Sequence, residues 1–274
     1  MERQTENQRQ NTYGIEKSVA DALQSKLLEL GAEVIQKQTT ASKHSKTVPL
    51  DIVTESDLLV ERELKKFIGE HRPEDGFLGE EKSSSVSKSG VTWYTDPIDG
   101  TLNYSRGDDN YSLSIGCAYQ DTPIFGAVYF PRRKELFISH AGSGAFLNDA
   151  PLEVTPKEKS LKELCGEFCM MRTDLRLKEL RYLLDQNVGY LFSYASATYA
   201  SSRVALGNMD FFVHTSPTVF DYGAIALIAK ESGCYVAQDF SGTPVKYQNG
   251  PTQLVICRTE RIAKQLGELV AKVG

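Results

Sequence analysis

The stretch Val91-Thr92-Trp93-Tyr94-Thr95-Asp96-Pro97-Ile98-Asp99-Gly100-Thr101 carries the most structural information in this chain. Its first five residues are β-branched or aromatic, which predicts a buried strand that ends at Asp96. Pro97 fixes its own φ and favours an extended backbone at Asp96, and Gly100 lacks the Cβ that would keep a ligand away from the backbone. Carboxylates held rigidly in this way, here Asp96 and Asp99, can bind a hard cation such as Mg²⁺. The simpler interpretation is an ordinary Asp-Pro-Gly turn between two strands.

Three other segments place acidic residues at the ends of predicted elements. Glu80 follows a short apolar strand pattern, Asp57 precedes a helical pattern, and Asp221 opens an apolar helix. Taken singly, Asp57 and Asp221 could each be only a helix N-cap. Together with Asp96 and Asp99, the three segments predict a metal cluster that is assembled from distant parts of the chain.

These acidic segments resemble, in order and spacing, the motifs of the inositol monophosphatase family, one branch of the lithium-sensitive, magnesium-dependent phosphatases. The family motif W-x-x-D-P-[IL]-D-G-T-x-N-[FY] corresponds to Trp93–Tyr104, and W-D-x-[AG]-[AG] corresponds to residues 220–224, with Phe220 in place of Trp. The shorter G-E-E and D-x-V-T-x-x-D elements correspond to Gly79–Glu81 and Asp51–Asp57. One long motif and three shorter ones, in the family's order over nearly the whole chain, resemble this family far more specifically than any single motif would.

The resemblance implies a phosphatase centre with two or three Mg²⁺ ions, with Mn²⁺ as a possible substitute. It implies that Glu80, Asp96 and the backbone carbonyl of Ile98 hold the first ion. Asp96, Asp99 and Asp221 would hold the second ion, so Asp96 would bridge the two. A third, weaker ion would lie near Glu80.

Hydrolysis of a phosphate monoester requires an oriented water and stabilisation of the developing negative charge. The resemblance implies that Thr101, hydrogen-bonded to Asp57, orients this water, so the implied catalytic residues are Thr101, Asp57 and Glu80. The backbone N–H groups of Gly100 and Thr101 would bind phosphate oxygens. Lys46 corresponds to a basic residue of the family's mobile loop. A turn hydrogen bond for Thr101, a helix cap for Asp57 and a solvated lysine are the simpler alternatives.

The substrate is less well determined by the sequence. The glutamate that inositol-specific members carry seven residues before the second-motif Asp is replaced by His214, and the family's Gly-x-Ala segment falls on residues 195–197. Ala195, Ala197 and His214 are therefore the expected substrate-binding residues. The change to His favours a different sugar or a nucleotide, and we expect its imidazole to titrate near neutrality. Alternatively, His214 points into the core or into a subunit contact.

Residues 102–104, which follow the D-G-T, are of the inositol type, whereas members that act on 3′-phosphoadenosine compounds or histidinol phosphate usually carry Lys there. This favours inositol monophosphate or a related sugar phosphate. The alternatives are 3′-phosphoadenosine nucleotides, fructose-1,6-bisphosphate, histidinol phosphate and NADP.

A function of another class is a protein- or RNA-binding regulator with a vestigial phosphatase site. The complete set of acidic residues argues against a decayed site, and the net charge of −5 argues against electrostatic binding of nucleic acid. We therefore expect a small-molecule phosphate ester as partner and no nucleic acid. The family is often dimeric, so the resemblance also implies a homodimer.

Composition sets further bounds on the 274-residue chain. The mean hydropathy is −0.33 and the sequence has no run of 18 apolar residues, so we expect no membrane span. Met1–Asn11 has no hydrophobic core and is expected to be a disordered lead-in, not a secretory signal. Five scattered cysteines without zinc-ligand spacing favour a reduced, cytoplasmic protein, with Cys117, Cys234 and Cys257 buried as small hydrophobic residues.

The order of predicted elements indicates an α+β fold. Helical periodicity is expected at residues 15–34, 58–68, 175–186, 198–206, 221–232 and 260–273, and strands at 91–95, 111–119, 124–130, 135–140, 211–214 and 254–257. The family resemblance implies a layered αβαβα sandwich of the inositol monophosphatase and fructose-1,6-bisphosphatase type. We expect one phosphatase domain over residues 12–274 in two intimate halves, a metal-site half (12–155) and a substrate-side half (156–274).

Overall fold

The computed structural model describes residues 14–40, 42–45, 52–170, 175–247 and 253–272, so the predicted lead-in lies outside the described residues. The helices are α2 (Lys17–Lys37), α3 (Glu55–His71), α4 (Thr101–Arg106), α5 (Leu175–Asn187), α6 (Ala197–Ala205), α7 (Val219–Tyr222), α8 (Ile225–Glu231) and α9 (Glu260–Val270). The strands are β1 (Lys43–Ser45), β2 (Ile52–Thr54), β3 (Gly76–Gly79), β4 (Ser84–Ser85), β5 (Val91–Asp99), β6 (Ser112–Tyr119), β7 (Thr122–Phe130), β8 (Glu135–His140), β9 (Ala145–Leu147), β10 (Ala150–Leu152), β11 (Cys165–Cys169), β12 (Tyr190–Phe192), β13 (Phe211–His214), β14 (Tyr235–Ala237) and β15 (Leu254–Cys257).

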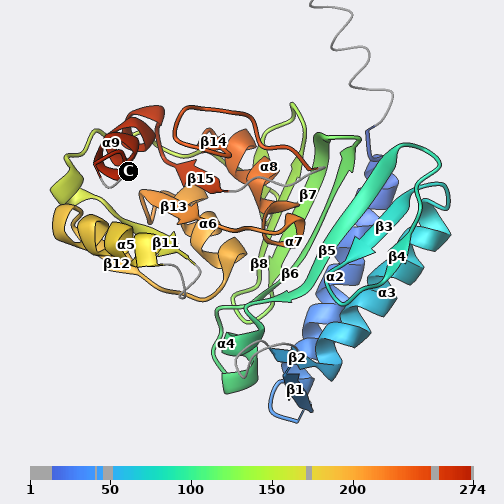
Figure 1. Ribbon diagram of the computed structural model, residues 1–274. Helices are drawn as coiled ribbons and strands as arrows, with labels where there is room; N and C mark the ends of the chain where they lie inside the picture. Colours follow the sequence, from blue (N-terminus) through green and yellow to red (C-terminus); the bar gives the residue numbers. More distant parts are fainter. Residues whose placement is uncertain (1–13, 41, 46–51, 171–174, 248–252, 273–274) are drawn as a thin grey trace, which may run out of the picture.

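Helices and sheets alternate in five layers, which confirms the αβαβα arrangement expected from the family resemblance (Figure 1). An eight-stranded sheet has the order β10-β9-β8-β7-β6-β5-β3-β4, and a five-stranded sheet has the order β12-β11-β13-β15-β14. Helices α2 and α3 cover the outer face of the large sheet, α6 and α8 lie between the sheets, and α5 and α9 cover the outer face of the small sheet. A short β1–β2 pair stands apart from both sheets.

The period-2 alternation of the strands produces these layers, because successive side chains point to opposite faces of a sheet. In β6, Leu113 and Ile115 belong to the core beneath α2 and α3, whereas Ala118 belongs to the core between the sheets. In β13, Phe212 faces that central core and Phe211 faces α5 and α9. Both faces of both sheets are therefore covered.

The central layer is thin at one place, where two glycines of the large sheet meet the segment between α7 and α8. A Cβ on Gly116 of β6 would overlap the Gly223 carbonyl, and a Cβ on Gly126 of β7 would lie 2.5 Å from the Ala224 carbonyl oxygen. The Tyr247 hydroxyl also donates to the Gly223 carbonyl at 3.1 Å. This contact brings α7, and with it Asp221, against the large sheet.

Two expectations from the sequence are wrong here. Strand β5 does not end at Asp96 but continues to Asp99, because it pairs with β6 at both Asp96 and Asp99 with only an irregularity between them. Pro97, which has no N–H to donate, thus interrupts the ladder without ending the strand. The expected single helix over residues 221–232 is two helices, α7 and α8, broken at the close contact just described.

Strand β11 is missing from the sequence-based prediction. Its apolar pattern is interrupted by Glu167, which is buried and accepts a hydrogen bond from the backbone N–H of Tyr194 at 3.0 Å. A charged residue in the middle of a strand breaks the run of apolar residues from which a buried strand is predicted.

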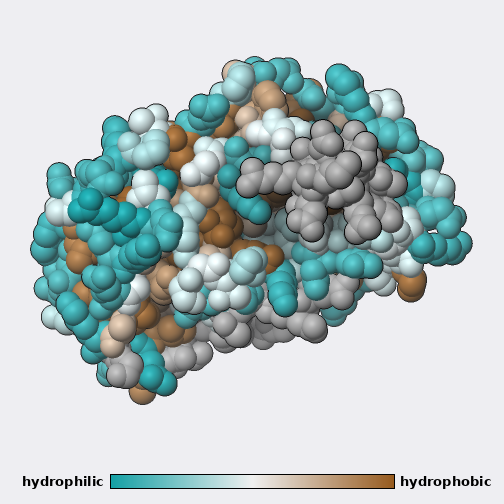
Figure 2. Space-filling view, turned by 90° about the horizontal axis from the view of Figure 1, so that it is seen from above, coloured by the Kyte–Doolittle hydropathy of each residue, from teal (hydrophilic) through white to brown (hydrophobic). Residues whose placement is uncertain are grey.

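On the face drawn in Figure 2, hydrophilic residues make up most of the described surface and hydrophobic residues show in smaller areas between them. None of the described helices combines the length and apolar character required to span a bilayer. Cys117, Cys234 and Cys257 are buried, as the sequence predicts, and all five cysteines are free thiols.

We predict that Gly116→Ala lowers the free energy of unfolding by about 1–3 kcal/mol, the usual cost of overpacking a close contact. The added methyl group must push the Gly223 carbonyl away from β6. Urea denaturation of the purified variant measures the change. Gly69→Ala is the matched control, since no atom lies within 4 Å of a Cβ at this position of α3, and it should stabilise by roughly 0.5–1 kcal/mol. Equal stability of Gly116→Ala and the wild type would contradict the close contact.

Candidate functional site

Asp96 is the centre of a group of acidic side chains. Only 5% of Asp96 is exposed. Burial raises the pKa of Asp96 well above its usual range, and the nearby Glu80, Asp99, Asp221 and Asp57 raise the pKa further. Glu80, Asp99, Asp221 and Asp57 thus all lie close enough to Asp96 to affect its pKa.

One oxygen of Asp96 lacks a partner among the described residues. Its Oδ1 is buried and has no hydrogen-bond partner within the described part of the chain. Burying a carboxylate oxygen without a partner is unfavourable, and a bound cation or a proton removes that cost. Asp96 therefore fits the role of a metal ligand.

Asp57 is fixed at the start of α3 by a capping box. Thr54, and not Asp57, is the N-cap residue. The Thr54 N–H and hydroxyl donate to Asp57 Oδ2 at 2.8 and 2.6 Å. Burial raises the pKa of Asp57 to about 7, against the lowering effect of the Thr54 hydrogen bonds. The prediction of a cap at Asp57 is wrong by one turn, because Asp57 occupies the third position of the helix and receives the bonds of the cap.

The other oxygen of Asp57 faces Thr101. The distance from Thr101 Oγ1 to Asp57 Oδ1 is 3.4 Å, and the distance from Thr101 Oγ1 to the Ile98 carbonyl oxygen is 2.9 Å. A hydroxyl carries one proton, so Thr101 donates to one of these acceptors at a time. The hydrogen bond from Thr101 to Asp57 that the family resemblance implies is therefore possible, although the Ile98 carbonyl is the closer acceptor.

Gly100 forms the turn between β5 and α4. Its φ of 87° lies in the left-handed region, and a Cβ would lie 2.8 Å from the Asn110 carbonyl oxygen. Only glycine fits both conditions without strain. The turn presents the start of α4 beside Asp99 and Asp57.

Asp99 is tied to the start of α6. The Ser196 hydroxyl donates to Asp99 Oδ2 at 2.6 Å, and the backbone N–H groups of Thr198 and Ala197 donate to Oδ2 and Oδ1 at 2.8 and 3.2 Å. The Thr198 hydroxyl also donates to Oδ2. Burial raises the pKa of Asp99, and these hydrogen bonds oppose the rise. Sequence analysis missed Ser196 and Thr198 as partners, although a serine before a helical run is an N-cap signal.

Asp221 is held in the same manner as Asp57. Thr218 is the N-cap of α7, and its N–H and hydroxyl donate to Asp221 Oδ2 at 2.5 and 2.8 Å. The expectation that Asp221 itself could be the N-cap is therefore wrong. Burial raises the pKa of Asp221, and Glu80 adds to the rise.

Glu80 and the expected substrate residues are placed at the edges of this cluster. Glu80 follows β3, is half-buried, and its N–H donates to the Thr95 carbonyl at 3.1 Å. Ala195 is exposed and has a φ of 53°. Ala197 is buried, and its N–H donates a hydrogen bond to Asp99 Oδ1. Lys46 lies outside the described residues.

His214 ends β13 and is half-buried. Burial lowers the pKa of His214 to about 4, against the opposing charge of Asp99. The expectation that this imidazole titrates near neutrality is therefore wrong. The Ser216 N–H donates to His214 Nδ1 at 3.1 Å, so the neutral ring carries its proton on Nε2.

The side chains do not form a closed ligand shell. Within residues 14–40, 42–45, 52–170, 175–247 and 253–272, no three His, Cys, Asp or Glu side chains are arranged as a ready-made metal site. Thr54 and Thr218 each hold one oxygen of Asp57 and Asp221, whereas Oδ1 of Asp96 has no hydrogen-bond partner among the described residues. The donor set is nevertheless all-oxygen and strongly acidic, which fits a hard cation such as Mg²⁺.

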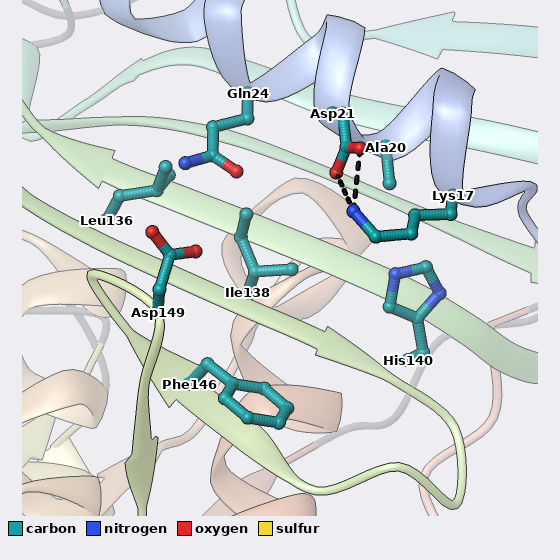
Figure 3. Close-up of a pocket in the computed structure, with 9 residues that line it drawn as sticks. All are labelled: Lys17, Ala20, Asp21, Gln24, Leu136, Ile138, His140, Phe146 and Asp149. Atoms are coloured by element: carbon teal, nitrogen blue, oxygen red, sulfur yellow. Dashed lines mark hydrogen bonds and ion pairs between the residues drawn. The ribbon is translucent and has the colours of Figure 1, made fainter.

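A separate cleft of about 360 Å³ lies between α2 and β8 (Figure 3). Its floor includes Leu136 and Ile138, and its rim carries an ion pair between Lys17 and Asp21. None of the residues that line it belongs to the acidic cluster. It has no part in the site described above.

The chain is similar to known proteins in both sequence and fold. The model of the inositol monophosphatase family matches residues 16–273. Inositol monophosphatase 1 of Homo sapiens is 31% identical over 236 residues, which cover 83% of this chain and 83% of that protein. The Nus factor SuhB of Xylella fastidiosa is 29% identical over 236 residues, 82% of this chain and 83% of that protein.

A solved structure of an IMPase/NADP phosphatase complexed with Mg²⁺ and phosphate has a TM-score of 0.81 to this chain at 23% identity. The match covers 94% of this chain and 95% of that one. The chain belongs to the inositol monophosphatase family, a family of phosphoric monoester hydrolases whose layered fold it shares.

Proposed function

We propose that this chain is a Mg²⁺-dependent phosphomonoesterase that hydrolyses inositol monophosphate or a related sugar phosphate. The observation that carries the proposal is Oδ1 of Asp96, which is buried near four other acidic side chains and has no hydrogen-bond partner among the described residues. Such a group is costly unless it binds a proton or a cation, and a cation held there can activate water and stabilise negative charge in phosphate-ester hydrolysis. The five free cysteines agree with a reduced, cytoplasmic setting, and we expect a homodimer.

Two or three Mg²⁺ ions, or Mn²⁺ in their place, would be held by Glu80, Asp96, the Ile98 carbonyl, Asp99 and Asp221. When bound, the ions supply Lewis-acid stabilisation of the phosphate and of the leaving oxygen and lower the pKa of a water. Burial, and after it the charges of Glu80, Asp99 and Asp221, raise the pKa of Asp96, so a cation that binds there takes the place of a proton.

Thr101 and Asp57 would handle the proton of the attacking water. Thr101 Oγ1 accepts a hydrogen bond from that water while its own hydroxyl donates a hydrogen bond to Asp57 Oδ1, 3.4 Å away. Asp57 cannot turn away, because the Thr54 capping box holds its Oδ2. The pair thus orients a lone pair of the water towards the phosphorus.

The turn at Gly100 would bind the phosphate group. Gly100 has a left-handed backbone, and successive N–H groups at such a turn can form an anion-binding nest, so those of Gly100 and Thr101 would donate to phosphate oxygens. A side chain at Gly100 would collide with the Asn110 carbonyl and block the approach.

His214 would contact the organic part of the substrate and so affect substrate specificity. Its Nδ1 is occupied by Ser216, so Nε2–H is the group available as a donor. The glutamate of inositol-specific members accepts hydrogen bonds in this position, whereas this imidazole donates one. We therefore place a substrate oxygen that accepts a hydrogen bond next to His214, as a sugar phosphate or a nucleotide ribose offers.

A regulatory role is the second candidate, because the chain is similar to a protein named Nus factor SuhB. A phosphate-release assay with and without Mg²⁺ separates the two functions. Inositol, fructose, glycerol, histidinol and nucleotide phosphates form the substrate panel. Absence of hydrolysis across the panel would favour the regulator.

We predict that Asp96→Asn abolishes phosphatase activity, because the substitution removes the charge and the donor geometry of the central ligand together. Mg²⁺ should raise the Tm of the wild type by mass action but leave the Tm of Asp96→Asn unchanged. Differential scanning calorimetry with and without Mg²⁺ measures this. Asp185→Asn, an exposed position on α5, is the control and should behave as wild type. Near-normal turnover of folded Asp96→Asn at saturating Mg²⁺ would show that the ligand assignment is wrong.

We predict that Thr101→Ala lowers kcat by about 10²–10⁴-fold with little change in KM, because proton handling matters mainly in the transition state. Thr101→Ser keeps the hydroxyl and should retain most of the activity. Asp57→Asn should cost a similar factor, and the double variant should cost much less than the product of the two. Independent, multiplicative losses in steady-state kinetics would mean that the two residues act separately.

We predict that His214→Glu changes substrate discrimination by roughly 10–200-fold in kcat/KM, about 1–3 kcal/mol, in favour of inositol 1-phosphate. The KM of the wild type should not follow a His214 titration between pH 6 and 8, because the lowered pKa keeps the ring neutral throughout that range. His214→Gln removes the imidazole Nε2–H donor without adding a charge, so it separates the effect of the donor from the effect of the carboxylate. Unchanged substrate ratios in both variants would place His214 outside the pocket.

A further inference from the structure

Glu61 is a buried carboxylate that the catalytic scheme above does not use. It lies one turn after Asp57 on α3 and is only 2% exposed. Burying a charged group is costly unless strong hydrogen bonds compensate it. Its position next to the acidic cluster therefore calls for a physical explanation.

Both oxygens of Glu61 bind the turn that carries Glu80. The Glu81 N–H donates to Glu61 Oε2 at 2.6 Å, and the Ser83 N–H donates to Oε1 at 2.8 Å. Hydrogen bonds to an ionised acceptor are short and stronger than neutral ones. The carboxylate thus fixes the backbone directly after Glu80 through two separate bonds.

The chain leaves room for this carboxylate at Gly79. A Cβ on Gly79 would overlap the Cδ and Oε2 atoms of Glu61. Gly79 has no positive φ, so its lack of a side chain is explained by this contact and not by backbone conformation. The turn from Gly79 to Ser83 packs against Glu61, and within it the Gly79 N–H donates a hydrogen bond to the Ser83 carbonyl at 2.8 Å.

We propose that Glu61 is a positioning residue for the metal centre, setting the place of Glu80 relative to Asp57 and Asp96. Asp57 and Glu61 are four residues apart and share one face of α3, so a single helix holds both the Thr101 partner and the Glu80 turn. The inference rests on the proposed function, since it assigns Glu61 a role in holding the cation that Glu80 would bind.

The test is Mn²⁺ binding to the full chain after removal of metal with EDTA, followed by the electron paramagnetic resonance signal of free Mn²⁺. Glu61→Ala should weaken Mn²⁺ binding by about 10- to 100-fold, the range for residues that orient metal ligands. Glu61→Gln keeps one acceptor oxygen and should give an intermediate loss. The KM for substrate should change less than kcat at a fixed Mg²⁺ concentration.

Asp75→Asn is the matched control. Asp75 is also a buried carboxylate, but it binds Trp93 Nε1 at 2.9 Å and Ser89 Oγ at 2.6 Å at the other end of β3. Its substitution should lower the thermal stability without changing Mn²⁺ affinity. Equal loss of Mn²⁺ affinity in Asp75→Asn and Glu61→Ala would overturn the proposal, because it would mean general loosening of the sheet edge.

Gly79→Ala provides an independent route to the same effect. In the wild-type background it should displace Glu61 and weaken Mn²⁺ binding, whereas in the Glu61→Ala background the methyl group fits the vacated space and should add little. Additive losses, or wild-type Mn²⁺ affinity in folded Glu61→Gln, would overturn the proposal. If Glu61→Ala does not fold, Glu61→Gln and Gly79→Ala decide. Failure of the wild type itself to bind Mn²⁺ would overturn the proposed function, and this inference with it.

Discussion

Burial of several like charges around Asp96 is the constraint on which the rest of the structure depends. Asp96 is almost inaccessible, and its Oδ1 has no hydrogen-bond partner in the part of the chain that the structure describes. Its acidic neighbours come from α3, the β3–β4 turn, the end of β5 and α7. Such an arrangement opposes folding unless the scaffold holds it firmly or a cation neutralises it. The five-layered core supplies the first condition, and the all-oxygen donor set provides for the second.

The scaffold holds the carboxylates by a repeated local device, the start of a helix. Asp57 and Asp221 each receive the N–H and hydroxyl of a threonine N-cap, and Asp99 receives the backbone N–H groups at the start of α6. The partial positive charge of a helix N-terminus favours a carboxylate there. A helix start that would ordinarily stabilise only its own helix thus also holds a carboxylate of the acidic cluster in one orientation. The close contact of Gly116 with Gly223 then presses α7 against the sheet and brings Asp221 to Asp96.

The sequence predicts the parts of this site that depend on local pattern. The strand before Asp96, the layered α+β fold and the convergence of the acidic segments on Asp96 follow from strand periodicity and from motif spacing. The details that depend on tertiary contacts could not be predicted. Strand β5 continues through Pro97, with β6 paired to it on both sides. The helix after Asp221 breaks where Gly116, which has no Cβ, allows the backbone of Gly223 to approach the sheet. Burial likewise lowers the pKa of His214 far below the value that the sequence alone suggests.

The most direct test of the account is a crystal structure of the chain grown with Mn²⁺ and measured at a wavelength where manganese scatters anomalously. The account predicts an anomalous peak within coordination distance of Asp96, about 2.0–2.3 Å for a hard cation and oxygen, with Glu80, Asp99 or Asp221 as further ligands. Well-ordered carboxylates with no anomalous peak beside Asp96, or peaks only elsewhere on the molecule, would contradict it.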